Sequence, residues 1–131
     1  MKFIALIYAD ESYYVDASPA DAAAVFQAHG EFSAAAREAG VFEGGDGLQG
    51  SATATTVRVR DGERLLTDGP FAETKEQLGG FYALECKDLD EALEWAARIP
   101  EAKTGVIEVR PVIDYAAMEG AASNGSEAAA S

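Results

Sequence analysis

The chain has 131 residues, 48% of them hydrophobic, and a formal net charge of −13 at pH 7. This length suits one domain around a single core, and this composition is typical of a globular protein. A strongly acidic protein repels phosphate backbones and anionic bilayers, so we expect neither nucleic acid nor a membrane as a partner. A lone cysteine, Cys86, cannot form an internal disulfide, and we interpret it as a packing residue in a cytoplasmic protein.

The first forty residues predict a strand followed by a helix. An unbroken apolar run at residues 3–9 is typical of a central strand covered on both faces, and the polar residues 10–16 predict a loop. Residues 18–21, Ser-Pro-Ala-Asp, combine a capping side chain, a first-turn proline and an acidic residue. They predict a helix that runs to about residue 39 and ends at Gly40. Its expected apolar face consists of Ala22, Val25, Phe26, Phe32 and Ala36.

The middle of the chain predicts a hairpin between two other segments. Residues 41–50 contain four glycines and predict a turn-rich connector. Strands are expected at residues 55–60 and 63–67 around Asp61-Gly62, a dipeptide typical of tight hairpin turns. Another strand is expected at residues 81–86, directly after a double glycine that predicts a bulge or a close backbone contact.

The last third predicts a helix, a strand and a tail. Asp88 is expected to cap the second helix, which Pro100 ends. The final strand is expected at residues 106–113. We therefore expect one domain at residues 1–115 and a disordered tail of small and acidic residues at 116–131. The expected buried stripe of the second helix is Leu89, Ala92, Leu93 and Ala96.

With the hairpin treated as an addition, this order predicts a β-α-β-β-α-β ferredoxin-like α+β fold. Two helices can cover only one face of such a sheet, whereas the first strand is apolar on both faces. We expect a second copy of the chain to bury the other face, which predicts a homodimer.

His29 is the single histidine, so any imidazole chemistry must use it. Its spacing from Phe26 and Phe32 places it on the apolar face of the first helix, where a core histidine with one satisfied nitrogen is the simple interpretation. The adjacent Gly30 costs a helix roughly 1 kcal/mol relative to alanine, which suggests a close approach to the backbone. An imidazole in an apolar wall is also typical of a small-molecule pocket.

Asp68 begins the turn Asp-Gly-Pro-Phe that leaves the hairpin. A structural interpretation is a turn in which the carboxylate bonds its own following amides. A functional interpretation is that Asp68 orients the imidazole of His29, within one subunit or across a dimer. Lys75 is either a solvated charge or a group that receives an anionic oxygen of a ligand.

No cofactor is expected. Residues 45–50 match the pattern G-x-G-x-x-G, but a strand-like segment follows, and a dinucleotide site requires a helix there. One histidine and one cysteine do not provide the spacing of a transition-metal site.

The segment DGPFAETKEQLGGFY, preceded by ATATTVRVRDGERLLT and followed by DLDEALEWAARIP and IEVRP, resembles the YCII-related family, specifically its DGPF-domain branch. The resemblance covers residues 1–115 and implies a ferredoxin-like dimeric α+β barrel. It also implies a site built on a histidine and an aspartate, which are here His29 in QAHGEF and Asp68 in DGPF. A YCII-type relative is associated with dehydrochlorination of a chlorinated hydroxyquinol, and DGPF domains are often encoded with or fused to sigma factors.

These features predict a cofactor-independent lyase or isomerase that acts on a small molecule, with His29 as general acid or base and Asp68 as its orienting partner. The alternative is a ligand-binding or regulatory module without catalysis, working beside a sigma factor. The residues expected to bind the ligand are Phe26, Phe32, Gly69, Pro70, Phe71, Lys75 and Tyr82.

Overall fold

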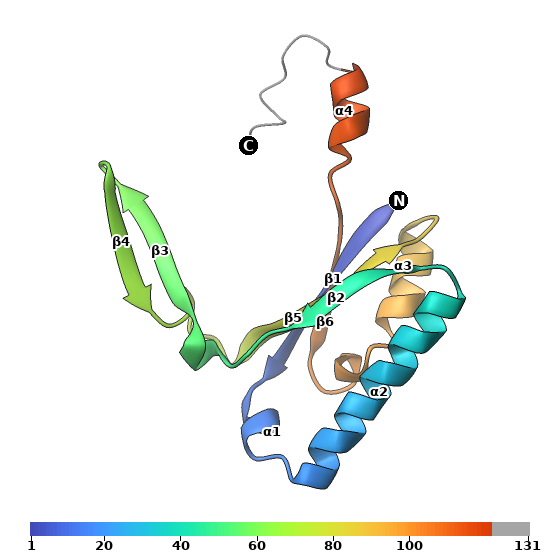
Figure 1. Ribbon diagram of the computed structural model, residues 1–131, viewed down its shortest axis with the longest axis horizontal. Coiled ribbons are helices and arrows are strands. Elements are labelled where there is room, and N and C mark those ends of the chain that lie inside the picture. The colour runs from blue at the N-terminus through green and yellow to red at the C-terminus, as the bar shows by residue number, and fades with distance from the viewer. Residues whose placement is uncertain (122–131) are drawn as a thin grey trace.

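The computed structural model describes residues 1–121 as an α+β fold with antiparallel sheets. A four-stranded sheet has the order β2-β5-β1-β6, and β3 and β4 form a separate two-stranded sheet (Figure 1). The strands are β1 (Lys2–Asp10), β2 (Phe42–Gly47), β3 (Thr55–Arg60), β4 (Glu63–Asp68), β5 (Glu76–Glu85) and β6 (Val106–Pro111). The helices are α1 (Ser12–Val15), α2 (Pro19–Glu38), α3 (Leu89–Ala96) and α4 (Tyr115–Ala121), with short 3₁₀ turns η1 (Ser51–Thr53) and η2 (Pro100–Ala102).

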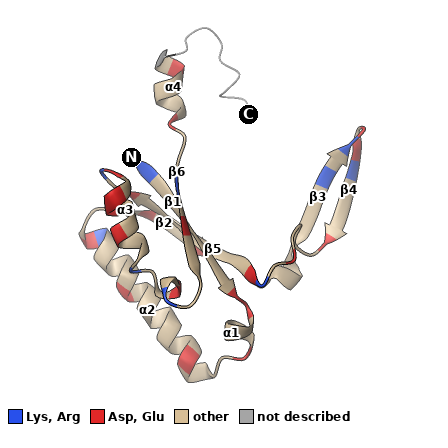
Figure 2. Ribbon diagram, turned by 180° about the vertical axis from the view of Figure 1, so that it is seen from behind, with Lys and Arg blue, Asp and Glu red and all other residues tan. Residues whose placement is uncertain are grey.

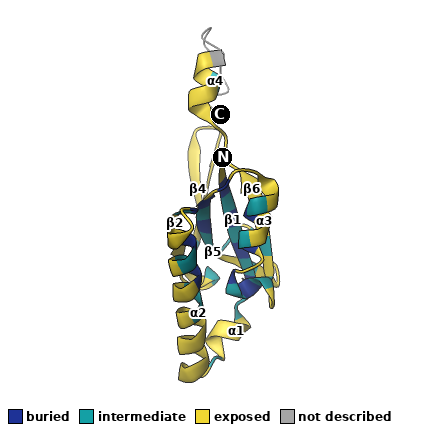
Figure 3. Cartoon of the chain, turned by 90° about the vertical axis from the view of Figure 1, so that its right-hand side faces the viewer, coloured by how far each residue is buried: buried dark blue, intermediate teal, exposed yellow. Residues whose placement is uncertain are grey.

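The core lies between the four-stranded sheet and helices α2 and α3, which cover the same face (Figures 1 and 3). Alternate residues of β1 point toward the helices and are buried, as the period of two in a strand requires. The core residues are Phe3, Ala5, Ile7, Phe32, Ala36, Val41, Tyr82, Leu84, Cys86, Ala92, Ala96 and Ile99.

The even-numbered residues of β1 point to the opposite face of the sheet. Ile4, Leu6 and Tyr8 are each partly exposed there. Leu6 pairs with Phe81 of β5 on one side and with Glu108 of β6 on the other. This face therefore combines apolar centres with charged neighbours.

The predicted connector at residues 41–50 is wrong in part, because it contains β2, an edge strand that pairs antiparallel with β5. Close packing of β2 against β5 requires glycine at Gly45 of β2 and at Gly80 of β5. A Cβ added at Gly45 would lie 2.6 Å from the backbone oxygen of Phe81, and one at Gly80 would lie 2.8 Å from that of Asp46. Strand β2 supplies the second strand of the sheet, and the β3–β4 hairpin is inserted after it.

The predicted helix caps are confirmed. The Ser18 side chain accepts a hydrogen bond from the Asp21 amide at 3.1 Å, and that of Asp88 accepts one from the Glu91 amide at 2.9 Å. The expected apolar faces are only half right, because the first half of α2 extends beyond the sheet (Figure 3). Phe26 is 82% exposed as a result, whereas Phe32 is buried. In α3 the two alanines are buried, but both leucines are 47% exposed.

The hairpin turn is confirmed by positive φ angles of 53° at Asp61 and 78° at Gly62. The hairpin β3–β4 projects away from the main sheet (Figure 1). The predicted bulge is also confirmed, because the pairing of β1 with β5 passes from Gly80 directly to Leu78 and skips Gly79. The polar loop expected at residues 10–16 instead contains one helical turn, α1.

Residues 115–121 form α4, where the sequence predicted the start of a disordered tail. The remainder of the predicted tail, residues 122–131, lies outside the described residues. Within residues 1–121, no helix is both long enough and apolar enough to cross a membrane.

Candidate functional site

His29 lies at the centre of a hydrogen-bonded group that joins four elements. Its Nδ1 atom is 2.7 Å from the hydroxyl of Tyr82 on β5, and its Nε2 atom is 2.8 Å from Oε2 of Glu101 on η2. Tyr14 of α1 donates a hydrogen bond to the same Glu101 oxygen at 2.9 Å. We call Tyr14, His29, Tyr82 and Glu101 the His29 network.

The turn η2 brings Glu101 to this position. Pro100 begins the turn, and the backbone oxygen of Glu101 accepts a hydrogen bond from the Gly105 amide at 2.7 Å. A Cβ at Gly105 would lie 2.2 Å from the backbone oxygen of Tyr8, so glycine is needed for the loop to pass this close to β1. The buried Ile99 anchors the other end of the turn in the core. Local packing thus fixes the carboxylate against the sheet.

Glu101 is the one polar or charged residue among the buried residues described, with 6% of its surface exposed. Burial raises the pKa of its carboxyl, but the hydrogen bond and charge of His29 and the hydrogen bond from Tyr14 outweigh burial, so that the pKa lies below its ordinary value. The side chain is therefore an ionised acceptor at neutral pH. Because a carboxylate has no hydrogen to donate, the hydrogen between it and His29 belongs to Nε2.

The two tyrosines of the network stay protonated. Burial, the hydrogen bond to Glu101 and the charge of Glu101 all raise the pKa of Tyr14. Burial is also the main reason that the pKa of Tyr82 is raised; the charge of Glu101 raises it further, against opposing effects of Ser33 and Arg37. The Tyr82 hydroxyl can therefore donate to Nδ1 of a neutral imidazole. The network then runs from Tyr82 through His29 to Glu101, with Tyr14 as a second donor to the carboxylate.

One oxygen of Glu101 is left over. Nε2 of His29 lies 2.8 Å from Oε1 as well as from Oε2, but only Oε2 is in hydrogen-bond geometry. Oε1 is buried and has no hydrogen-bond partner among the described residues. An unmatched carboxylate oxygen of this kind is uncommon in a folded protein.

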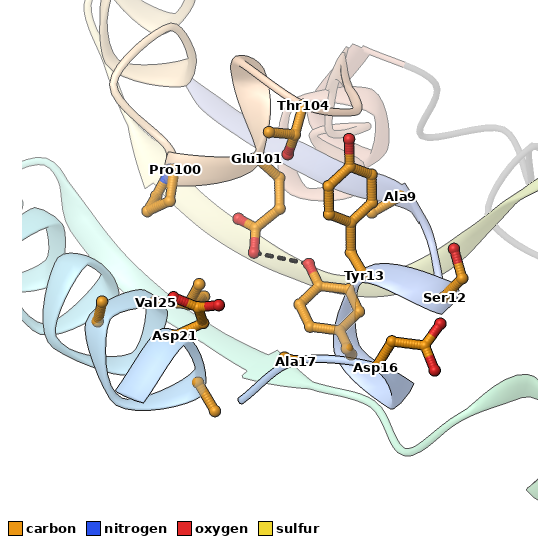
Figure 4. A pocket seen from close by; sticks show the side chains of 13 residues that line it. Ala9, Ser12, Tyr13, Asp16, Ala17, Asp21, Val25, Pro100, Glu101 and Thr104 are labelled. Atoms are coloured by element: carbon orange, nitrogen blue, oxygen red, sulfur yellow. Dashed lines mark hydrogen bonds between the residues drawn. The ribbon is translucent and has the colours of Figure 1, made fainter. Parts of the chain in front are cut away.

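A cavity of about 690 Å³ opens beside Glu101, between α1, the first turns of α2 and η2 (Figure 4). Tyr13 and Tyr14 line it from α1, and Asp21 and Val25 line it from α2. Glu101 belongs to its lining and His29 does not. A ligand in this cavity therefore meets the carboxylate first, and the imidazole lies behind it.

The structure does not bring Asp68 to His29 within one chain. Asp68 is exposed at the end of β4, on the projecting hairpin, and both ring nitrogens of His29 have other partners. A contact across two subunits stays a prediction. The next residue, Gly69, has a φ of 97°, and its amide donates to the Ala54 oxygen at 2.7 Å. Its own backbone oxygen accepts a hydrogen bond from Thr56 at 2.8 Å, so this turn holds the base of the hairpin together.

The other residues expected to bind a ligand are scattered. Tyr82 is the partner of His29, and Phe32 packs in the core with its ring centroid 4.7 Å from that of Tyr82. The side chains of Phe26 and Phe71 are 82% and 81% exposed. Pro70 is partly buried beside the hairpin exit.

Lys75 lines a second hollow of about 700 Å³, which shares Tyr13 and Thr104 with the first. Its charge contributes to the lowered pKa of Asp10, behind the hydrogen bonds that the amide and side chain of Ser12 donate to that carboxylate. The close approach expected at Gly30 is absent within the described part of the chain, because a Cβ there would meet nothing within 4 Å.

Two members of the network escaped the sequence interpretation. Tyr14 carries a usable signal, since two adjacent tyrosines in an otherwise polar segment are unusual. Glu101 carries none, because it is one of 23 acidic residues and only the tertiary fold buries it. In the part of the chain that the structure describes, no group of three or more His, Cys, Asp or Glu residues is arranged to hold a metal ion.

Comparison with known proteins identifies the family to which the chain belongs. The model of the YCII-related domain matches residues 1–116. An uncharacterized protein of Rhizobium meliloti (strain 1021) is 53% identical over 64 residues, which are 47% of this chain and 52% of that relative. The chain thus spans about half the length of that relative. Because the family match extends over nearly all of the described residues, the chain belongs to the YCII-related family.

Proposed function

We propose that the protein is a cofactor-independent enzyme of the lyase or isomerase type, in which the His29–Glu101 pair moves a proton to or from a small molecule. The observation that carries this proposal is the buried, ionised carboxylate of Glu101, held 2.8 Å from the imidazole and lining a cavity. A carboxylate and an imidazole at this distance form a working acid–base unit in many enzymes.

The proposed order of proton movement follows from which group meets the ligand. A carbon-bound or nitrogen-bound hydrogen of the ligand reaches Glu101 first, because His29 lies behind the carboxylate. Nε2 of the imidazole already carries the hydrogen of the His29–Glu101 bond, so Glu101 itself receives the proton and His29 holds the carboxylate in place. Tyr82 supports the second ring nitrogen, and Tyr14 fixes the carboxylate at the cavity wall.

Hydrogen exchange tests this proposal without knowledge of the product. Small molecules that bind the protein would be incubated with it in deuterium oxide, and proton NMR would follow the loss of their carbon-bound hydrogen signals. We expect protein-dependent exchange or turnover of at least one binder. His29→Gln and Glu101→Gln should each slow it by about a hundredfold or more, the usual contribution of acid–base catalysis.

Phe26→Ala provides the matched control, because Phe26 lies on the same helix and is 82% exposed. It should exchange hydrogen as fast as the unmodified protein. Exchange that survives in both His29→Gln and Glu101→Gln would contradict the proposal.

A second candidate is a ligand-binding or regulatory module without catalysis. The observation that favours it is that both ring nitrogens of His29 are engaged by protein groups. The same experiment separates the two candidates, since binders of the cavity that never exchange or turn over support the module. The sigma-factor association expected from the family resemblance belongs to this candidate.

Finer features of the family are also proposals. The strand order β2-β5-β1-β6, with α2 after the first strand of the sheet and α3 after the third, supports a ferredoxin-like assignment. The sequence Asp-Gly-Pro-Phe at 68–71 supports the DGPF branch. The apolar side chains on the open face of β1 support a homodimer in which two sheets pack face to face.

A further inference from the structure

The charged residues that line the cavity beside Glu101 are all acidic. Among the described residues that line it, Asp16, Asp21 and Glu101 are acidic, and none is a lysine, arginine or histidine. An anionic ligand would meet three carboxylates there and no basic side chain in the lining. A positively charged ligand would gain from all three.

Aromatic rings accompany these carboxylates. Tyr13 and Tyr14 line the cavity from α1 and are 61% and 47% exposed. The face of a tyrosine ring attracts a cation that lies within about 6 Å. Ala17, Ala22 and Val25 supply apolar surface in the same cavity. The lining therefore suits a ligand with a cationic head and an apolar body.

The unmatched oxygen of Glu101 is an independent indication. Oε1 is buried and accepts no hydrogen bond from the described residues. The Glu101 side chain is 8% exposed and lines the cavity. A ligand N–H group can donate a hydrogen bond to the carboxylate of Glu101, whereas a ligand carbonyl or carboxylate cannot, because neither has a hydrogen to donate.

The charge distribution of the whole protein acts in the same direction. The net charge of −13 raises the local concentration of cations around the molecule. Figure 2 shows basic positions, coloured blue, on the β3–β4 hairpin, away from α1 and α2. Lys75 lies in the neighbouring hollow, where Asp10 and Glu76 accompany it, rather than in this one.

We propose that the cavity between α1, α2 and η2 binds an organic ammonium ion with an apolar body, whose N–H group bonds to Glu101. The inference rests on the proposed function in taking this cavity as the ligand site. It is independent of whether the bound molecule is transformed.

Three probes of similar shape and different charge test the proposal: phenethylammonium, phenethyl alcohol and phenylacetate. Each would be titrated into the isotope-labelled full-length protein at neutral pH, with the amide signals of Tyr13 and Ala22 as readout. We expect the ammonium to bind about tenfold or more tightly than the alcohol, as a hydrogen bond to a charged group implies. Phenylacetate should bind most weakly at these amides. Added salt should weaken only the ammonium markedly.

Single substitutions test which carboxylates produce the preference for the ammonium. Asp21→Asn should weaken ammonium binding about two- to fivefold, as expected for an exposed charge, and leave the alcohol unchanged. Asp61→Asn is the matched control at the hairpin tip and should change the binding of neither the ammonium nor the alcohol. Glu101→Gln should remove most of the preference for the ammonium.

The proposal is overturned if the alcohol or phenylacetate binds these amides as tightly as the ammonium, or if the ammonium shifts other amides or none. Hydrogen exchange distinguishes failure of the proposed catalytic function from failure of this inference. If the ammonium binds the cavity but no binder of the cavity shows protein-dependent hydrogen exchange or turnover, the catalytic function fails and this inference stays intact.

Discussion

The hydrogen bond from Tyr14 to Glu101 should contribute measurably to stability, and its energy should depend on the charge of Glu101. The bond is 2.9 Å long and ends on a buried carboxylate. Hydrogen bonds to charged groups contribute about 1.5–3 kcal/mol. Because Tyr14 is 47% exposed, water replaces part of the lost bond, and we expect Tyr14→Phe to cost about 1.5 kcal/mol, at the low end of this range.

Urea denaturation measures this cost. With an m-value of about 2 kcal/mol/M, a loss of about 1.5 kcal/mol lowers the denaturation midpoint by about 0.75 M. In the Glu101→Gln background the acceptor is neutral, so the same Tyr14→Phe change should cost about 0.5–1 kcal/mol. The difference between the two values is the coupling energy of the pair.

Tyr13→Phe is the matched control. Tyr13 is the adjacent residue, is 61% exposed, and its hydroxyl makes no hydrogen bond to the other described residues. Its loss should change stability by less than about 0.5 kcal/mol. The reasoning is refuted if Tyr14→Phe costs no more than Tyr13→Phe, or if Glu101→Gln leaves the cost of Tyr14→Phe unchanged.

Three further predictions concern pH, backbone and assembly. The pKa of folded Glu101 lies below its ordinary value of 4.5, so its stabilisation is complete above that value and is lost as the pH falls through the folded-state pKa. Unfolding free energies of the protein and of Glu101→Gln should therefore differ at neutral pH and converge in acid; a constant difference argues against the ionised pair. Gly30→Ala should stabilise α2 by about 0.5–1 kcal/mol, because a Cβ there meets nothing. Gly69→Ala, at a φ of 97°, should destabilise the protein by about 1–2 kcal/mol. Thermal unfolding checks both glycine variants, and stability changes of the same sign in Gly30→Ala and Gly69→Ala would contradict these expectations. Leu6→Glu should convert a dimer into a monomer in analytical ultracentrifugation while Phe26→Glu does not, and an unmodified protein that sediments as a monomer rules out the homodimer.

Much of the fold could be predicted because local chemistry determines it. The capping side chains of Ser18 and Asp88 and the hairpin turn at Asp61-Gly62 each act within three residues, so the sequence alone reveals them. Strand β2 could not be recognised from such signals. Gly45 of β2 is required by contact with β5, which lies more than thirty residues further along the chain.

The site shows the same division. His29 could be singled out because it is the sole histidine and lies at helical spacing from apolar residues. Its partner Glu101 could not be recognised in the sequence, because η2 and α2 meet only in the tertiary structure. What distinguishes Glu101 from the other acidic residues is its burial. Asp68 is indicated both by its turn and by the family resemblance, but within one chain the carboxylate beside the imidazole is that of Glu101.

NMR of the imidazole nitrogens of His29 tests most directly whether His29 and Glu101 form one acid–base unit. The protein contains one histidine, so selective labelling gives one unambiguous set of signals. We predict that the neutral ring carries its hydrogen on Nε2, with Nδ1 accepting from Tyr82, and that Glu101→Gln changes the Nε2 hydrogen signal strongly. A neutral ring with its hydrogen on Nδ1 instead of Nε2, or nitrogen signals that Glu101→Gln leaves unchanged, would contradict the pairing of His29 with Glu101.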